Sequence, residues 1–326
     1  MSLQTILQYL KNNSKVICVV NGTLYEAELI KIDEKEDDSC ISVRIPHLLQ
    51  TELSFYWNDE KQKFWLSTNT YLLFPDIQPE RIESTIYVIS DLHTEFGPTV
   101  GNNPNNWPNA DILILAGDIG NPNLISFRDL LITAKEKYSE VIFVAGNHEF
   151  YGCNYNQKTV IDKMKTIAIE TKTHFLHRES KIIRGIEFIG TTLWTLIGDL
   201  DCNYLRDFNE GVFKERIDYV EEFITDYSFI RDTLNNSSST HPKIVITHHL
   251  PIKKLIHSKF HSNPYNSAFY TDILHKINLK NIIYWFCGHT HEYMKTKYGN
   301  TTLVVNPVGY PNENKITKIS NEVFTV

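Results

Sequence analysis

The feature that most constrains the fold is a repeating pattern that starts near residue 85. Short runs of β-branched and aromatic residues, which are typical of buried strands, alternate with stretches of helical periodicity. The predicted strands are 86–90, 112–115, 141–144, 186–189, 244–246, 282–286 and 302–305. Strands and helices in alternation predict an α/β fold, with functional residues in the loops at the strand ends.

Two of the helical stretches carry an apolar stripe on one face. The first stripe consists of Val160, Ile161, Met164, Ile167 and Ala168, and the second of Ile217, Val220, Ile224, Tyr227, Ile230 and Leu234. We expect both stripes to pack against the core of the protein, and we assign them no further role.

Five short polar motifs follow five of the predicted strands. They are Asp91-Leu92-His93, Gly117-Asp118, Gly146-Asn147-His148, Thr247-His248-His249 and Gly288-His289-Thr290-His291. Their carboxylate, carboxamide and imidazole groups suit divalent first-row transition metals. Asp91 and His93 alternate along an extended segment, so their side chains can point the same way. Asp118 has two oxygens and can serve two ions, which predicts a two-metal site.

These motifs, in this order, resemble the calcineurin-like metallophosphoesterase superfamily over about residues 85–326. Segments 146–152, 190–194, 206–208 and 306–310 resemble a bacterial branch of that family. The resemblance implies a two-sheet β-sandwich flanked by helices. Periodicity alone would not distinguish such a sandwich from a doubly wound sheet.

The resemblance also implies a role for each motif residue. One metal would take Asp91, His93, Asp118 and His291, and the other Asp118, Asn147, His248 and His289. His148, left without a metal, would protonate the leaving group or stabilise charge on a phosphoryl oxygen. Contact with substrate and a packing role stay open for four neighbours, which are His249, Tyr151, Trp194 and Asp207.

The implied reaction is hydrolysis of a phosphate ester by a hydroxide that bridges two divalent ions. The ions would be Mn, Fe, Zn, Ni or Co, and we expect Mn to support an assay. The substrate would be a small phosphomonoester or phosphodiester, nucleotide-derived compounds included. Two alternatives are a nuclease acting on nucleic-acid ends or single strands, and a binding scaffold that keeps its metals without turnover. The formal charge of −7 disfavours the nuclease, and the complete ligand set disfavours the scaffold.

Residues 1–80 predict a separate, small all-β domain ahead of the catalytic domain at 81–326. Strands are expected at 15–20, 24–32, 40–45, 53–57 and 64–68, with a tight turn at Asn21-Gly22. A joint with two prolines at 74–81 would end the domain. An SH3- or Tudor-like barrel is one interpretation, and oligomerisation or substrate recruitment are its two candidate roles.

The remaining composition bears on location. Five cysteines without Cys-x-x-Cys spacing predict neither a disulfide framework nor a structural zinc site. The first residues lack the basic leader and apolar run of a signal peptide, and no apolar stretch is long enough to cross a bilayer. We therefore expect a cytoplasmic protein without a membrane partner.

Overall fold

The chain forms two compact units, residues 1–82 and residues 83–326. The structure is a computed structural model, and it describes residues 15–20, 23–33, 40–44, 52–58, 63–67, 70–73, 83–97, 101–198, 202–237, 239–313 and 319–326.

The first unit is a closed barrel of six antiparallel strands, in which β1 pairs with both β2 and β6. Ile41 pairs with Phe55 across β3 and β4, and both side chains are fully buried together with Val43. Closure of the barrel leaves none of the described strands with an unpaired edge at which another chain could add a strand. The predicted turn at Asn21-Gly22 and the joint at 74–81 lie outside the described residues. The strands are β1 (Lys15–Val20), β2 (Thr23–Asp33), β3 (Cys40–Arg44), β4 (Glu52–Asn58), β5 (Lys63–Ser67) and β6 (Thr70–Leu73).

The second unit contains two sheets. The five-stranded sheet has the order β10-β9-β8-β7-β17, and the six-stranded sheet has the order β11-β12-β13-β14-β16-β15. The first is built from β7 (Thr85–Ile89), β8 (Ile112–Ala116), β9 (Glu140–Val144), β10 (His174–Phe175) and β17 (Val323–Thr325). The second is built from β11 (Glu179–Ile183), β12 (Ile186–Gly190), β13 (Lys243–Ile246), β14 (Ile282–Cys287), β15 (Met294–Tyr298) and β16 (Thr301–Val305).

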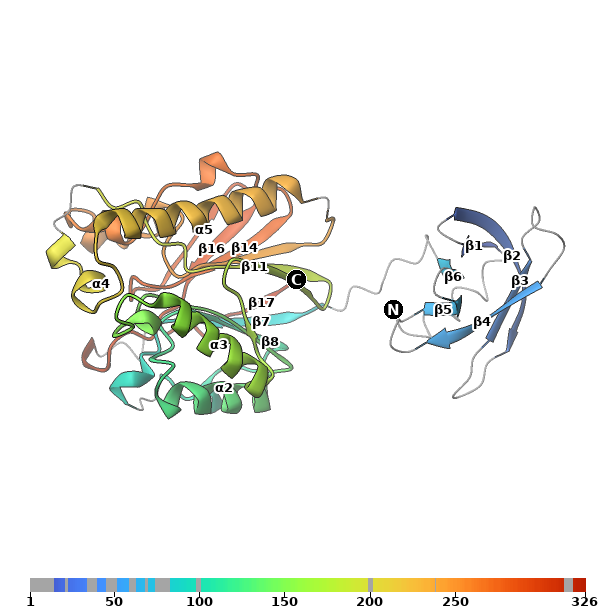
Figure 1. The fold of residues 1–326 in the computed structure, drawn as a ribbon, viewed down its shortest axis with the longest axis horizontal. Helices are drawn as coiled ribbons and strands as arrows, with labels where there is room; N and C mark the ends of the chain where they lie inside the picture. The colour runs from blue at the N-terminus through green and yellow to red at the C-terminus, as the bar shows by residue number, and fades with distance from the viewer. Residues whose placement is uncertain are drawn as a thin grey trace. The chain divides into compact units, whose positions relative to one another are not determined.

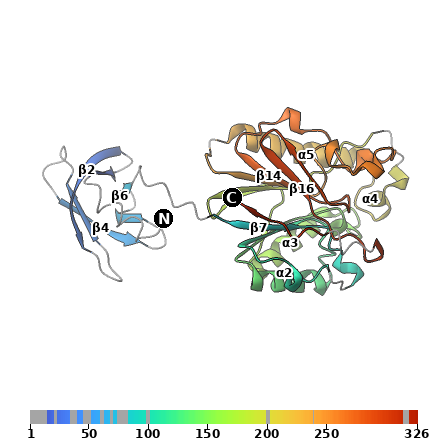
Figure 2. The same cartoon turned by 180° about the vertical axis from the view of Figure 1, so that it is seen from behind.

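The two sheets pack face to face and are covered by helices on their outer faces. Val88 and Ile114 of one sheet belong to the same buried cluster as Phe188 and Ile244 of the other. α2 (Ile125–Lys137) and α3 (Gln157–Thr171) lie over the five-stranded sheet, and α5 (Arg216–Asn236) lies over the six-stranded one, as Figure 1 and Figure 2 show. A short helix, α4 (Arg206–Asn209), precedes α5. The predicted two-sheet sandwich flanked by helices is confirmed.

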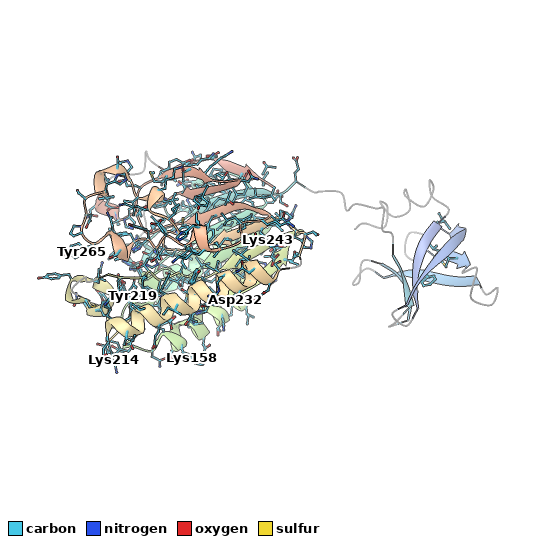
Figure 3. All side chains as sticks on the ribbon, turned by 90° about the horizontal axis from the view of Figure 1, so that it is seen from above. Lys158, Lys214, Tyr219, Asp232, Lys243 and Tyr265 are labelled. Carbon is cyan, nitrogen blue, oxygen red and sulfur yellow. The ribbon has the colours of Figure 1, made fainter. Side chains whose placement is uncertain are left out.

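The predicted apolar face of α3 is largely correct, whereas that of α5 is correct only in part, since Ile230 and Leu234 are buried and Val220 and Tyr227 pack against the core. Ile217 and Ile224 are 54% and 51% exposed, whereas Tyr219, Phe223 and Asp226 are buried. The Asp226 carboxylate accepts hydrogen bonds from the Thr191 hydroxyl and the Trp194 N–H and pairs with Arg178. These contacts of Asp226 fix which face of α5 turns toward the core. A search for apolar periodicity misses them because Asp226 is a polar residue. Lys158 of α3 and Asp232 of α5 extend outward from the helices (Figure 3).

Parallel pairing brings the ends of the motif-bearing strands together. β7, β8 and β9 are parallel neighbours, and so are β13 and β14. The carboxyl ends of parallel neighbours meet at one edge of a sheet. Backbone bonds also link the two sheets there, since the Ser90 N–H donates to the Asn306 carbonyl and the Gly309 N–H donates to the Asp91 carbonyl. All five motifs therefore meet at one end of the sandwich.

Among the described residues, the helices fall short of the length and apolar character that a membrane crossing requires.

We predict that a fragment starting at Glu83 folds without the barrel. The N–H of Ser84 donates to Val326 and the N–H of Val326 donates back, at 3.0 and 3.1 Å, so this fragment keeps the whole five-stranded sheet. Calorimetry should show one unfolding transition that coincides with a transition of the full chain. A control fragment starting at Ile89 loses most of β7 and should aggregate. Aggregation of both fragments would contradict the prediction.

Candidate metal centre

Five of the seven predicted metal ligands have a strained backbone. Asp91, His93, Asp118, His289 and His291 adopt φ angles of 55°, 48°, 52°, 71° and 49°. This left-handed conformation costs residues other than glycine roughly 1–2 kcal/mol each. Such strain persists where the surrounding structure holds it, and it gathers at functional sites. Here the backbone bends sharply just past each strand, which turns the side chains toward one another.

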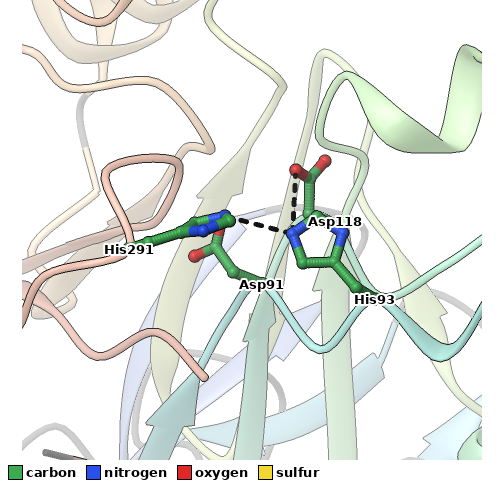
Figure 4. A group of neighbouring side chains, drawn as sticks. All are labelled: Asp91, His93, Asp118 and His291. Carbon is green, nitrogen blue, oxygen red and sulfur yellow. Dashed lines mark hydrogen bonds and ion pairs between the residues drawn. The ribbon is translucent and has the colours of Figure 1, made fainter. Parts of the chain in front are cut away.

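The first cluster joins Asp91, His93, Asp118 and His291, whose ligand atoms all lie within 4.8 Å of one another (Figure 4). The Nε2 atoms of His93 and His291 are 3.1 Å apart. The Nε2 of His291 is 3.4 Å from the Asp91 Oδ1, and the Nε2 of His93 is 3.8 Å from the Asp118 Oδ2. Two imidazole nitrogens and two carboxylates thus point at one small volume, as the ligands of a single metal do.

The second cluster joins Asp118, His248 and His289 within the same distance limit. The Nε2 of His248 is 3.4 Å from the Asp118 Oδ1. The Nδ1 of His248 is 2.9 Å from the Ala116 carbonyl, a bond that fixes a proton on Nδ1 and turns Nε2 toward the cluster. Asp118 belongs to both clusters, with a different oxygen facing each.

Asn147 follows β9 and lines the same pocket as Asp118 and His289 of the second cluster. Its Nδ2 donates to the Tyr151 hydroxyl at 2.7 Å and to the Asp207 Oδ1 at 3.0 Å, which leaves Oδ1 for the cluster. The Oδ1 of Asn147 and the Nε2 of His248 are both buried and lack a hydrogen-bond partner among the described residues. A buried polar atom left unpaired costs about 1–3 kcal/mol. A divalent cation would satisfy both lone pairs, so the donor set fits a second metal.

The four neighbours left open by the sequence fall into two groups. Tyr151 and Asp207 hold the Asn147 amide, as described above. Trp194 is buried among rings, with its centroid 4.8 Å from that of Phe213 and 5.3 Å from that of His249. The His249 ring is fully buried and lies 4.2 Å from the His289 ring. Trp194 and His249 therefore pack behind the cluster.

Two carboxylates that the motifs did not reveal stand behind the imidazoles. The Glu95 Oε1 is 3.2 Å from the His93 Nδ1 and 2.8 Å from the His148 Nδ1. These three side chains are also close enough together to hold a metal ion. The Glu313 Oε2 is 2.9 Å from the His291 Nδ1. A carboxylate in this position fixes which imidazole nitrogen carries the proton. Glu95 follows His93 by two residues, a spacing that could have suggested it, whereas Glu313 gives no sequence signal.

Glu149 is a third missed residue, and it ties two motif loops together. Its carboxylate accepts hydrogen bonds from the backbone N–H groups of Ile119 and Gly146, each at 2.6 Å, and of Asp118 and Gly120, at 3.1 and 3.2 Å. Its position directly after His148 could have suggested a role, but not its backbone partners. Burial and the nearby Asp118 raise the pKa of Glu149 to about 7.

Two glycines allow the loops to approach this closely. A Cβ atom at Gly117, where φ is 85°, would collide with the His248 ring. A Cβ atom at Gly146 would collide with the Asp118 carboxylate. The glycine of each motif is therefore a steric requirement of the cluster.

The buried carboxylates make the site attractive to cations. Burial lowers the pKa of His248, but Asp118 and Asp91 outweigh it and raise that pKa to about 9. Burial also opposes protonation of His291, but Asp91 and Glu313 raise its pKa to about 10. His289 behaves differently, because burial and the neighbouring imidazoles hold its pKa well below the usual value. His289 is therefore neutral at pH 7, the form that binds a metal.

His148 faces the same site but is held by other groups. Its backbone N–H donates to the Asp118 Oδ1 at 2.9 Å, and its ring Nε2 is 2.9 Å from the hydroxyl of Tyr310, which ends the family-like segment 306–310. Burial lowers the pKa of His148, but Asp118 and Glu95 outweigh it, so the net shift is upward. The ring therefore lines the pocket beside the clusters in an orientation fixed by Glu95 and Tyr310.

The comparison with protein families agrees with this geometry. Residues 84–293 match the profile of the calcineurin-like phosphoesterase family. The chain belongs to this family and is a metal-dependent phosphohydrolase.

One protein of similar sequence and one solved structure of similar fold illustrate the likeness. An uncharacterized protein of Acanthamoeba polyphaga mimivirus is 31% identical over 258 residues, which cover 69% of this chain and 91% of that protein. The crystal structure of the phosphopantetheinyl hydrolase of Mycobacterium tuberculosis superimposes with a TM-score of 0.57 at 19% identity. The superposition covers 75% of this chain and 96% of that chain, and at this identity it shows a shared fold.

We predict that Glu149 is a main source of stability at this end of the sandwich. Each backbone N–H left unpaired costs about 1–3 kcal/mol, so Glu149→Ala should lower the free energy of unfolding by at least about 3 kcal/mol in urea. Glu149→Gln keeps an acceptor oxygen and should lose less. The control is Glu170→Ala, which removes an exposed ion pair with Arg128 and should change the free energy by no more than about 0.5 kcal/mol. Equal stability of Glu149→Ala and Glu170→Ala would refute this role.

Proposed function

We propose that the chain hydrolyses a small phosphate ester with the help of two divalent ions. The observation that carries the proposal is the position of Asp118, whose Oδ2 faces His93 and whose Oδ1 faces His248. One carboxylate shared by two clusters is the arrangement that a two-metal site needs.

The ligand assignment follows from the clusters. Asp91, His93, Asp118 and His291 would hold one ion, and Asp118, Asn147, His248 and His289 would hold the other. The unpaired Oδ1 of Asn147 and Nε2 of His248 support the second set. Divalent ions of the Mn, Fe, Zn, Ni or Co type, once bound, activate water as a nucleophile near neutral pH and offset charge on the phosphoryl oxygens.

His148 is the residue we assign to proton transfer. Glu95 orients its ring from Nδ1, so Nε2 is the atom that would donate a proton to the leaving oxygen. Tyr310 lies 2.9 Å from that Nε2 and keeps it directed into the pocket. Asp118 and Glu95 raise the pKa of His148, which favours the protonated ring.

The pocket favours a small ester over a polymer. It measures about 320 Å³ next to the clusters, within the range typical of small-molecule sites. Of the described side chains that line it, Arg206 is the one Lys or Arg. A nucleic-acid strand would need a longer basic groove. The proposal includes both phosphomonoesters and phosphodiesters.

We assign the barrel of residues 1–82 a role outside the chemistry. Every residue in the proposed ligand sets lies in the second unit. Oligomerisation and substrate recruitment are its two candidate roles.

We predict that Asp118→Ala loses metal and activity together. Without the shared carboxylate the two cations would face each other unscreened. Metal analysis of the protein loaded with Mn²⁺ should find about two ions per native chain and clearly fewer in the variant. Hydrolysis of bis(p-nitrophenyl) phosphate should fall to background. Asp232→Ala, on the exposed side of α5, is the control and should keep both properties. An Asp118→Ala protein with full turnover would rule out the two-metal proposal.

We predict that His148→Ala keeps its metals and loses turnover by roughly 10²–10⁴-fold, the usual contribution of a positioned acid. The loss should be smaller for nitrophenyl esters than for alkyl esters, because nitrophenolate leaves without protonation. His275→Ala, at an exposed histidine, serves as the control. A His148→Ala protein that binds less metal would show that His148 is a ligand.

A further inference from the structure

The pocket over the metal centre extends well beyond the atoms that would hold the ions. One part of its lining consists of Asp118, Asn147, His289 and His291. A second part comes from residues 205–207 and from the connection between β13 and β14, which contains the short turns Lys253–Leu255, Ser258–Phe260 and Asn266–Ala268. The phosphoryl group would occupy the first part, so the second part would receive what is attached to it.

The second part of the lining is mainly apolar. Its apolar side chains are Leu205, Ile256, Phe260, Ala268 and Phe269. Leu205, Ile256 and Ala268 are buried, at 9%, 2% and 6% exposure. The Phe269 ring centroid lies 4.7 Å from that of His289, so the apolar surface begins directly at the proposed ligands. An ester group bound to phosphorus would meet this wall at its first atoms.

Polar side chains on the same wall take part in the protein's own hydrogen bonds. The Nδ2 of Asn266 donates to the Phe260 carbonyl at 2.8 Å, and the Oδ1 of Asn263 accepts from the Tyr265 N–H at 2.9 Å. The Asp207 carboxylate accepts a hydrogen bond from the Asn147 amide, and the Nε of Arg206 donates to the Glu210 Oε1 at 3.2 Å. The polar hydroxyls of a sugar would lose hydration here and gain few bonds in exchange.

The wall is held in place against the metal centre. Lys259 forms an ion pair with the buried Glu292, which directly follows His291. The Leu250 N–H donates to the Phe269 carbonyl at 3.0 Å and thereby ties the far end of the connection to the loop that bears His248. A positioned apolar wall can select its ligand by shape and burial.

The apolar surface continues outside the pocket. Tyr204 and Tyr265, neighbours in sequence of the lining residues Leu205 and Asn266, are 70% and 36% exposed. Each tyrosine belongs to a different segment of the wall, and their ring centroids are 6.4 Å apart. Tyr265 is labelled in Figure 3.

We propose that this wall binds the organic group of the substrate and that this group is an apolar chain or ring. The substrate is then an alkyl or aryl phosphate ester and not a sugar phosphate or a nucleotide. The assignment rests on the proposed function, because it takes the phosphoryl group to lie at the metal centre.

Binding of phosphonates, which keep the charged head and cannot be hydrolysed at the P–C bond, tests the assignment without turnover. Calorimetry on the full chain loaded with Mn²⁺ would compare methyl-, hexyl-, benzyl- and 2,3-dihydroxypropylphosphonate. Each buried methylene should tighten binding roughly fourfold, so the hexyl and benzyl compounds should bind at least about tenfold more tightly than methylphosphonate. Dihydroxypropylphosphonate should bind no more tightly than methylphosphonate.

A variant locates the effect. Phe260→Ala removes a ring from the wall and should reduce the preference for benzylphosphonate, while the affinity for methylphosphonate stays the same. Phe127→Leu, in the core under α2 and outside the pocket, should leave the preference intact.

The outcomes separate the two proposals. Equal affinities across the series, or tightest binding of the dihydroxypropyl compound, would overturn the apolar assignment even if the protein hydrolyses esters. An apolar preference in a protein that hydrolyses no ester would overturn the proposed function and support the assignment of the wall. Absence of binding by all four phosphonates would count against both.

Discussion

The arrangement of this site depends on the buried carboxylate of Asp118. Burial alone would raise its pKa, but His248 and His148 hold that pKa well below the usual range, so the group is ionised. Its Oδ1 accepts the N–H of His148 and faces His248, while Oδ2 faces His93. An ionised group in such surroundings requires nearby positive charge. Two cations would meet this requirement from both sides, which explains why ligands from both sheets gather around it.

Holding Asp118 in place requires support from the fold. The residue sits in a left-handed turn directly after β8, and such a turn would relax if the loops could separate. Glu149 prevents this by binding the N–H groups of Asp118 and of Gly146 with one carboxylate. The motif Gly146-Asn147-His148-Glu149 thus combines a glycine that permits close approach, a proposed ligand, a proposed proton donor and a carboxylate that joins two loops in four successive residues. Because four successive residues each have a different role, the turn after β9 is easily recognised in the sequence.

The sequence predicted those parts of the structure that local patterns determine. Strands β8 and β9 are buried on both faces, so their apolar runs were visible, and the residues that end them were recognisable by type. Edge strand β11 is mostly exposed and carries no such run, and it was not predicted. Glu313 contacts His291 from 22 positions away, and the rotation of α5 depends on Asp226 meeting Arg178. Contacts of this kind arise from tertiary packing, which a local pattern does not contain.

The same distinction applies to the two halves of the site. The metal centre lies at the ends of central parallel strands, where the fold itself fixes the geometry, so its chemistry follows from the family. The apolar wall comes from the segments around Leu205 and Phe260, which connect elements and can change length and composition without disturbing a strand. On the proposal made above, the fold determines what happens to the phosphoryl group, whereas the connections would determine which ester binds. For this reason the reaction class was accessible from the motifs, and the substrate has to be inferred from the shape and polarity of the wall.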